Sequence, residues 1–230
     1  MQSEDRAIAQ KTWDKIAESF DITRQKPWIY CLEYIHSLKP TDVVADIGCG
    51  NGRHLLPCAK QCESVFGLDI SLQFLRIVQK KLHYKSLTNT SLIHADAVYL
   101  PFTEDSFDAI LFIASLHNIR GGDHRRHALT EVARILRPGG TALISVWSRW
   151  QDKYYRYFLK QLITHKRDLG DIEVWWRQHH LNVPRFYHLY GKREFLRDLQ
   201  SAGFQIQHCK AVMICSKRYP DNYFALVQKR

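Results

Sequence analysis

The sequence has no apolar run long enough to cross a membrane. Its longest apolar stretch, residues 109–116, falls far short of the ~20 residues that a membrane-spanning helix needs. Residues 1–5 are polar and offer no apolar core of a secretory signal. Internal repeats and low-complexity segments are also missing. We therefore expect a soluble cytoplasmic protein with no membrane partner.

The six cysteines lack both a C-x-x-C pair and a regular framework. This pattern favours buried thiols in a reducing compartment over a disulfide scaffold. Cys58 and Cys62 lie one helical turn apart, but no second ligand pair has matching spacing, so we expect no bound metal. The six are Cys31, Cys49, Cys58, Cys62, Cys209 and Cys215.

Acidic residues are fewer than basic ones, and the imbalance is local. The 230 residues have a formal net charge of +10, with ordinary hydrophobic (45%) and charged (24%) contents for a globular domain. Residues 1–150 carry 18 Lys+Arg against 16 Asp+Glu, whereas residues 151–230 carry 15 against 7. A basic segment suits a polyanionic partner, most simply nucleic acid, although a solubilising surface has the same composition.

A glycine-rich turn is the feature around which the chain is organised. Residues 43–47, which suit a buried parallel strand, run directly into Gly48, Gly50 and Gly52, and a helical pattern begins at His54. This order predicts a strand, a tight turn and a helix, because glycine permits the turn and lets a ligand approach the backbone. The helix N-terminus then faces that ligand. Alone, the pattern also fits an inert connection.

Acidic residues follow the next two predicted strands. Residues 63–68 form a strand ending at Asp69, about twenty residues beyond the turn, where doubly wound folds place the carboxylate that binds both ribose hydroxyls. Residues 91–95 form another strand, ending at Asp96. The turn differs from the dinucleotide pattern G-x-G-x-x-G, and Asp46 at its start suits a cationic ligand better than a phosphate.

The spacing Asp-x-Gly-x-Gly-x-Gly over residues 46–52 resembles motif I of the class I S-adenosylmethionine (SAM) methyltransferases. The resemblance implies SAM as cofactor, against a phosphate nucleotide or an inert turn. In this family an acid after the third strand contacts the adenine amine, and a small residue beside it leaves room for the ring. The implied cofactor-binding residues are Asp46, Gly48, Cys49, Gly50, Gly52, Asp69, Ile70, Asp96, Ala97 and Ser115.

The whole pattern predicts an α/β fold with a doubly wound, seven-stranded, mostly parallel sheet of the Rossmann-like class I methyltransferase type. We expect a single domain over residues 1–230, with leading helices in residues 1–40 and a basic, aromatic, helical insertion at residues 148–190 that forms part of the substrate face. Predicted helices cover residues 3–20, 27–37, 71–83, 123–136, 153–166, 173–180 and 192–202. Later strands cover residues 109–113, 141–147, 204–211 and 222–227, with a chain reversal at residues 137–140.

Three segments carry a narrower resemblance. They are residues 13–20 (Trp-Asp-Lys-Ile-Ala-Glu-Ser-Phe), 23–28 (Thr-Arg-Gln-Lys-Pro-Trp) and 185–190 (Arg-Phe-Tyr-His-Leu-Tyr). Together they resemble the tRNA wobble-uridine carboxymethyl methyltransferases, which include the methyltransferase domain of the AlkB-homologue fusion enzyme. The resemblance implies tRNA as partner and the carboxylate of 5-carboxymethyluridine as methyl acceptor. The implied catalytic candidates are Arg24, His117, His188 and Tyr190.

The residues after the fourth strand bear on the acceptor. Enzymes that methylate exocyclic amines of bases often present Asn/Asp-Pro-Pro-Tyr there, whereas residues 115–118 read Ser-Leu-His-Asn, which disfavours that route. The narrower family often has two consecutive histidines where this chain has His117 and Asn118. A carboxylate is already ionised at neutral pH, so it needs a cation such as Arg24 rather than a strong base.

The narrower resemblance also implies a heterodimer with a small zinc-containing activator that covers an apolar edge. Two other functions stay open. A small-molecule methyltransferase of the ubiquinone-biosynthesis type shares the glycine turn, but the basic C-terminal third and residues 187–190 weigh against it. A SAM-binding scaffold without enzyme activity is disfavoured by the intact set of Asp46, Asp69 and Asp96.

Overall fold

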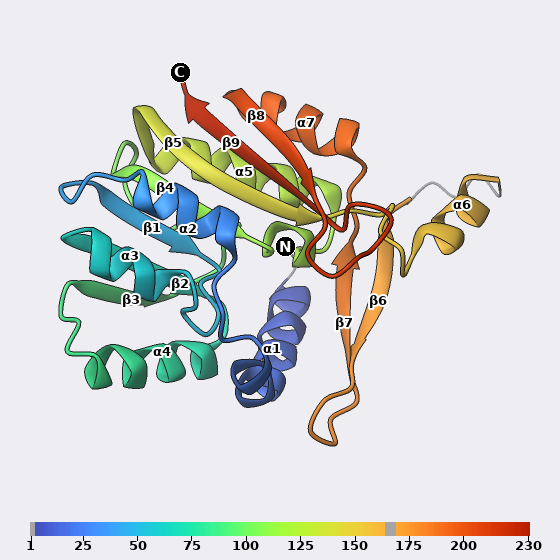
Figure 1. Ribbon diagram of the computed structural model, residues 1–230, viewed down its shortest axis with the longest axis horizontal. Coiled ribbons are helices and arrows are strands. Elements are labelled where there is room, and N and C mark those ends of the chain that lie inside the picture. Colours follow the sequence, from blue (N-terminus) through green and yellow to red (C-terminus); the bar gives the residue numbers. More distant parts are fainter. Residues whose placement is uncertain (1–2, 164–168) are drawn as a thin grey trace.

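The computed structural model describes residues 3–163 and 169–230, and Figure 1 shows a central twisted sheet with helices on both faces. The helices are α1 (Ser3–Thr23), α2 (Ile29–His36), α3 (Leu55–Gln61), α4 (Leu72–Tyr84), α5 (Gly122–Ile135), α6 (Tyr155–Ile163) and α7 (Lys192–Ser201), with a 3-10 turn η1 (Leu116–Asn118). The strands are β1 (Val43–Ile47), β2 (Ser64–Asp69), β3 (Thr90–His94), β4 (Phe107–Ile113), β5 (Leu136–Trp147), β6 (Asp171–Trp176), β7 (Val183–His188), β8 (Phe204–Val212) and β9 (Asn222–Lys229).

The described strands form a seven-stranded sheet in the order β3-β2-β1-β4-β5-β9-β8. The pairs from β3 to β5 are parallel, whereas β9 runs antiparallel to both β5 and β8. This confirms the predicted doubly wound, mostly parallel sheet. No helix within the described residues is both long and apolar enough to span a bilayer.

The two faces of the sheet bury separate cores. Val44 packs with α2, α3 and α4 on one face, and its neighbour Ala45 packs with α5 and α7 on the other. Successive side chains of a strand point to opposite faces, so a central strand covered on both sides must be apolar throughout. The apolar β1 therefore places the glycine turn that follows it at the carboxyl edge of the sheet.

The connection into β5 differs from the predicted chain reversal. Leu136 already pairs with Phe107, and Thr141 pairs with Ala109, so the pairing register shifts around residues 137–140. Those residues bulge out of the ladder within a strand that begins earlier than predicted. A bulge accommodates the extra residues without ending the pairing.

In the part of the insertion that the structure describes, a helix is followed by a β-hairpin. The prediction of a helix at residues 173–180 is wrong, because β6 occupies residues 171–176. β6 pairs antiparallel with β7, and neither strand was predicted from the sequence. Val174 and Trp176 are buried while Glu173 and Trp175 are exposed, an alternation typical of a strand. The helix predicted at residues 153–166 is present as α6, and residues 164–166 of that prediction lie outside the described residues.

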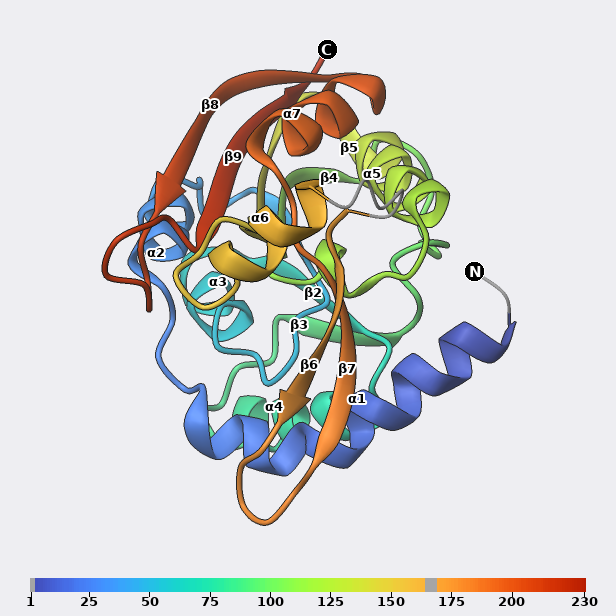
Figure 2. The same cartoon turned by 90° about the vertical axis from the view of Figure 1, so that its right-hand side faces the viewer.

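The hairpin packs against α1 beyond the carboxyl edge of the sheet (Figure 2). Ile16 of α1 forms a small core with Trp176 and Val183, and the ring of Phe20 stacks on Trp176 with centroids 5.5 Å apart. The N-terminal helix and the insertion, far apart in sequence, thus form one wall beside the glycine turn.

Candidate active site

The glycine turn is held by the neighbouring strand and by the residue after β4. The amides of Gly48 and Cys49 both donate to the Leu68 carbonyl, at 2.7 and 2.9 Å. Gly48 has φ +68°, and a Cβ there would lie 2.3 Å from Oγ of Ser115, whose hydroxyl donates to the Gly48 carbonyl at 3.1 Å. Gly50 has φ +54°, but a Cβ there would meet nothing within 4 Å. Gly48 is needed for packing, and Gly50 borders open space where a ligand can approach.

Two carboxylates lie buried beside this turn. Asp46 is 1% exposed, and its Oδ2 has no hydrogen-bond partner. Burial, and to a lesser extent the negative charge of Asp69, raise the pKa of Asp46 to about 7. Asp69 accepts hydrogen bonds from the amides of Gly50 and Ser71, both at 2.8 Å. Burial raises the pKa of Asp69 to about 6 in spite of those two bonds. An unpartnered buried carboxylate is stabilised by a cationic ligand.

The third acid also keeps an oxygen without a hydrogen bond. Oδ1 of Asp96 accepts from the Val98 amide at 3.0 Å, while its buried Oδ2 has no hydrogen-bond partner and lies 4.0 Å from Nε of Arg6. Ala97 packs on the core beside it, and the Ile70 carbonyl is hydrogen-bonded to the His94 ring. The predicted cofactor-binding residues are therefore placed along the carboxyl ends of β1, β2, β3 and β4.

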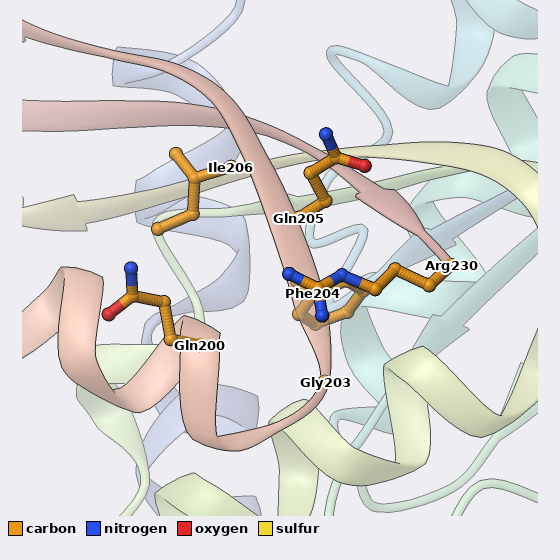
Figure 3. A pocket seen from close by; sticks show the side chains of 6 residues that line it. All are labelled: Gln200, Gly203, Phe204, Gln205, Ile206 and Arg230. Atoms are coloured by element: carbon orange, nitrogen blue, oxygen red, sulfur yellow. The ribbon is translucent and has the colours of Figure 1, made fainter.

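Two hollows lie away from this set. One, of about 390 Å³, lies between α7 and β8 (Figure 3). Its lining residues are Gln200, Gly203, Phe204, Gln205, Ile206 and Arg230. Phe204 pairs with Lys229 beside the start of β5, so this hollow is at the opposite edge of the sheet from the glycine turn. The other, of about 740 Å³, lies between α4 and β3.

His117 sits in the η1 turn that follows β4 and is buried. Its Nδ1 accepts from the Trp147 amide at 3.2 Å, so the neutral ring carries its proton on Nε2. Burial, and to a lesser extent the positive charge of Arg185, lower the pKa of His117 to about 3. The ring lies 5.5 Å from the Trp147 ring and 5.1 Å from that of Tyr187. His117 is therefore a neutral hydrogen-bond donor at physiological pH rather than a base or a cation.

Arg24 follows the end of α1 and is exposed. Its guanidinium lies 5.5 Å from the centre of the Trp176 ring and donates to the Thr23 carbonyl at 3.1 Å. Its own carbonyl accepts from Nδ2 of Asn51, within the glycine turn, at 3.0 Å. Asn51 also donates to Asp21 at 2.8 Å. These bonds fasten the link after α1 to the cofactor-binding turn.

His188 and Tyr190 are buried where the end of β7 meets α7. Nδ1 of His188 lies 2.6 Å from Asp171 and Nε2 lies 2.8 Å from Glu194, so carboxylates engage both ring nitrogens. Tyr190 is 0% exposed and packs on Phe195, and burial raises the pKa of its hydroxyl. These contacts join the hairpin to α7.

One functional candidate was missed by the sequence analysis. Arg185 of β7 is 7% exposed and lies among the rings of Trp13, Trp176 and Tyr187, at 5.0 to 5.6 Å from their centres. An arginine at an inward-facing strand position, between apolar Val183 and Tyr187, is the signal that would have identified it. That signal required β7 to be recognised as a strand.

Comparison with known proteins agrees with this geometry. Residues 45–144 match the family model described as a methyltransferase domain. The chain therefore contains a methyltransferase domain, and its glycine turn, strand-end acids and sheet order are those of the class I SAM-dependent fold, whose cofactor is SAM. Asp46, Asp69 and Asp96 lie at or just after the carboxyl ends of β1, β2 and β3, and Gly50 lies in the turn after β1.

Within this class, the sequence resembles one group of tRNA-modifying enzymes. It is 35% identical over 142 residues to the mouse tRNA (carboxymethyluridine(34)-5-O)-methyltransferase ALKBH8, covering 62% of this chain and 20% of that protein. It is 28% identical over 212 residues to the Schizosaccharomyces pombe tRNA (carboxymethyluridine(34)-5-O)-methyltransferase, covering 85% and 88%. The chain spans about a fifth to a third of the length of the first curated relatives it matches.

Solved structures share the fold at low sequence identity. A SAM-dependent methyltransferase from Methanosarcina mazei superposes with a TM-score of 0.73 at 22% identity, covering 89% of this chain and 98% of that one. A putative methyltransferase in complex with the Haloferax volcanii Trm112 methyltransferase activator superposes with a TM-score of 0.69 at 16% identity, covering 96% of each chain. These likenesses support the fold.

Proposed function

We propose that the chain methylates the carboxymethyl group of 5-carboxymethyluridine at the wobble position of tRNA and so converts the acid into its methyl ester. The observation that carries this proposal is the chemistry of the acceptor side. Arg24 and Arg185 supply positive charge there, and His117 supplies a neutral donor whose pKa of about 3 makes it a poor base. Such a site suits an acceptor that is already an anion.

The reaction needs little more than alignment. SAM supplies a methyl group on a sulfonium. Transfer forms a bond from this carbon to a carboxylate oxygen and breaks the carbon–sulfur bond, leaving a neutral thioether, so no proton has to move. Arginine binds a carboxylate through two parallel hydrogen bonds, which fixes the direction of the attacking oxygen. Arg24 is the residue that we assign to this contact, with Nε2–H of His117 as a further donor.

The outer face of the β6–β7 hairpin supports RNA as the substrate. Trp175 is 42% exposed and has the Arg177 guanidinium 5.9 Å from its ring centre. On β7, which pairs with β6, the ring of the half-buried Phe186 has the Arg120 guanidinium 4.3 Å from its centre. Aromatic rings beside cations suit unstacked bases and phosphates together. We assign residues 148–190 to the substrate face of a single domain spanning residues 1–230.

A small zinc-containing activator is the partner we propose, in a cytoplasmic heterodimer. The shared fold of the Haloferax volcanii methyltransferase that is complexed with its Trm112 activator supports this proposal. The edge strand β3 pairs only with β2 among the described strands, and the hollow between α4 and β3 has Leu72 on its rim, 39% exposed. An edge with unpaired backbone groups beside apolar side chains is suited to be covered by another chain.

A labelling experiment tests the function. The protein, with and without a candidate activator, is incubated with methyl-labelled SAM and either bulk tRNA or a pool of small metabolites. Label that is nuclease-sensitive and lost in mild alkali marks an ester on tRNA. Label found only in small molecules would refute the proposal and favour the small-molecule alternative.

A further inference from the structure

Arg185 is a buried cation for which the described residues supply no anion. Its Nε donates to the Val174 carbonyl at 3.3 Å, and one terminal nitrogen donates to the Tyr187 hydroxyl at 2.7 Å. Both acceptors are neutral. Within residues 3–163 and 169–230, no carboxylate forms an ion pair with it, whereas the similarly buried Arg149 is paired with Glu194.

A charge in this position is costly unless something compensates it. Transfer of an isolated ion from water to a protein interior is unfavourable, and arginine keeps its charge in proteins. The faces of Trp13, Trp176 and Tyr187 offset part of that cost through cation–π attraction. A bound anion would offset the rest, so the fold holds Arg185 ready for a negatively charged ligand.

The surroundings place that ligand on the acceptor side. Arg24 and Arg185 lie 5.5 and 5.0 Å from the centre of the same Trp176 ring. The positive charge of Arg185 also lowers the pKa of His117. His117 lies two residues beyond Ser115, whose hydroxyl donates to the Gly48 carbonyl in the glycine turn. The buried arginine therefore lies between the hairpin and the cofactor-binding edge.

We propose that Arg185 binds the carboxylate of the methyl acceptor and, with Arg24, determines that a carboxymethyl group is accepted while its neutral carbamoylmethyl counterpart is not. This inference rests on the proposed function, since it concerns the acceptor of that reaction. Arg24 is exposed and makes the two-bond contact that directs the attacking oxygen, whereas Arg185 is fixed by its bonds to Val174 and Tyr187 and adds a second, buried positive charge toward the same carboxylate. A neutral amide in the same place would leave the buried charge uncompensated.

The test compares two tRNAs that differ only in this group, carrying carboxymethyluridine or carbamoylmethyluridine at the wobble position. The dissociation constants of both are measured for the full chain with Arg185→Gln, Arg185→Lys and Arg197→Gln, the last a change on the exposed face of α7. Charge-assisted hydrogen bonds contribute enough that we expect the wild-type preference for the carboxymethyl tRNA to fall by about 10- to 100-fold in Arg185→Gln. Arg197→Gln keeps the preference.

The ratio of the two constants is insensitive to a general loss of RNA affinity. Arg185→Gln with normal SAM binding and an undiminished ratio overturns the inference. Arg185→Lys keeps the charge without the planar fork, so it should keep part of the preference. Should Arg185→Gln not fold, the wild type is decisive, because equal dissociation constants for the two tRNAs overturn the inference as well. Wild-type protein that fails to methylate the carboxymethyl tRNA contradicts the proposed function instead, so the two failures are distinguishable.

Discussion

Replacement of Gly50 by alanine tests two properties of the glycine turn. The change in melting temperature measures the cost of its backbone conformation, and the change in SAM-induced stabilisation measures its role in binding SAM. The backbone at Gly50 has φ +54°, and its amide donates to Asp69. A left-handed conformation costs a residue with a Cβ about 1–2 kcal/mol. For a domain of this size, each kcal/mol lowers the melting temperature by about 2–4 °C, so we expect Gly50→Ala to melt about 2–8 °C lower and still fold.

The binding effect is larger and is measured by thermal denaturation with and without SAM. A ligand at 100 times its dissociation constant stabilises the folded state by about 2.7 kcal/mol, which the wild type should show as a shift of about 5–11 °C. In Gly50→Ala the methyl group enters the open side of the turn, where a Cβ meets no protein atom within 4 Å, and the cofactor is excluded. We expect the SAM-induced shift to disappear.

Gly203→Ala is the matched control. Gly203 has φ +91° and open space around its Cβ position, but it lies between α7 and β8 at the far edge of the sheet. It should carry a similar or larger backbone cost and keep the full SAM shift. An undiminished shift in Gly50→Ala would show that this turn does not approach the cofactor.

Three further predictions follow from the same geometry. The pKa of Asp46 in the folded protein, about 7, is above its unfolded value, so the ligand-free protein should lose stability as pH rises from about 4 to 7. SAM affinity should rise over the same range, because a cationic ligand favours the ionised carboxylate. Calorimetry should find this rise in affinity absent in Asp46→Asn. Trp175→Ala should weaken tRNA binding by about 1–3 kcal/mol in filter binding without changing the melting temperature, whereas Trp176→Ala should destabilise the fold by about 3–5 kcal/mol. Arg24→Ala should reduce kcat/KM by about 10- to 100-fold with SAM affinity retained, and a collapse of SAM affinity would contradict its assignment to the acceptor.

The sheet and the cofactor-binding turn could be predicted from the sequence because their signals are local. Residues 43–45 are apolar because they lie between two helical layers, and the glycines are required by steric contacts among residues a few positions apart. Asp69 and Asp96 follow from the same pattern, one strand end after another. The helix predicted from residue 71 is present as α4, and Ser71 caps it by accepting from the Phe74 amide at 3.2 Å.

The hairpin and the environment of its side chains could not be predicted, because distant residues determine them. Trp175 and Trp176 are adjacent and equally apolar, and only packing of α1 against Trp176 decides which of them is buried. His188 resembles a catalytic histidine in the sequence, yet Asp171 and Glu194, on either side of it in the chain, take both of its nitrogens. Arg185 became a candidate only when β7 placed it inward.

The bond from Asn51 to the Arg24 carbonyl has a consequence for binding. Asn51 belongs to the turn that holds the methyl donor, and Arg24 belongs to the segment that we assign to the methyl acceptor. A donor molecule that orders the turn thereby reduces the entropy lost when the acceptor docks, and such linkage is reciprocal. The two substrates should then bind cooperatively, each lowering the dissociation constant of the other, and the demethylated product, which keeps most of the same contacts, should inhibit by retaining the RNA.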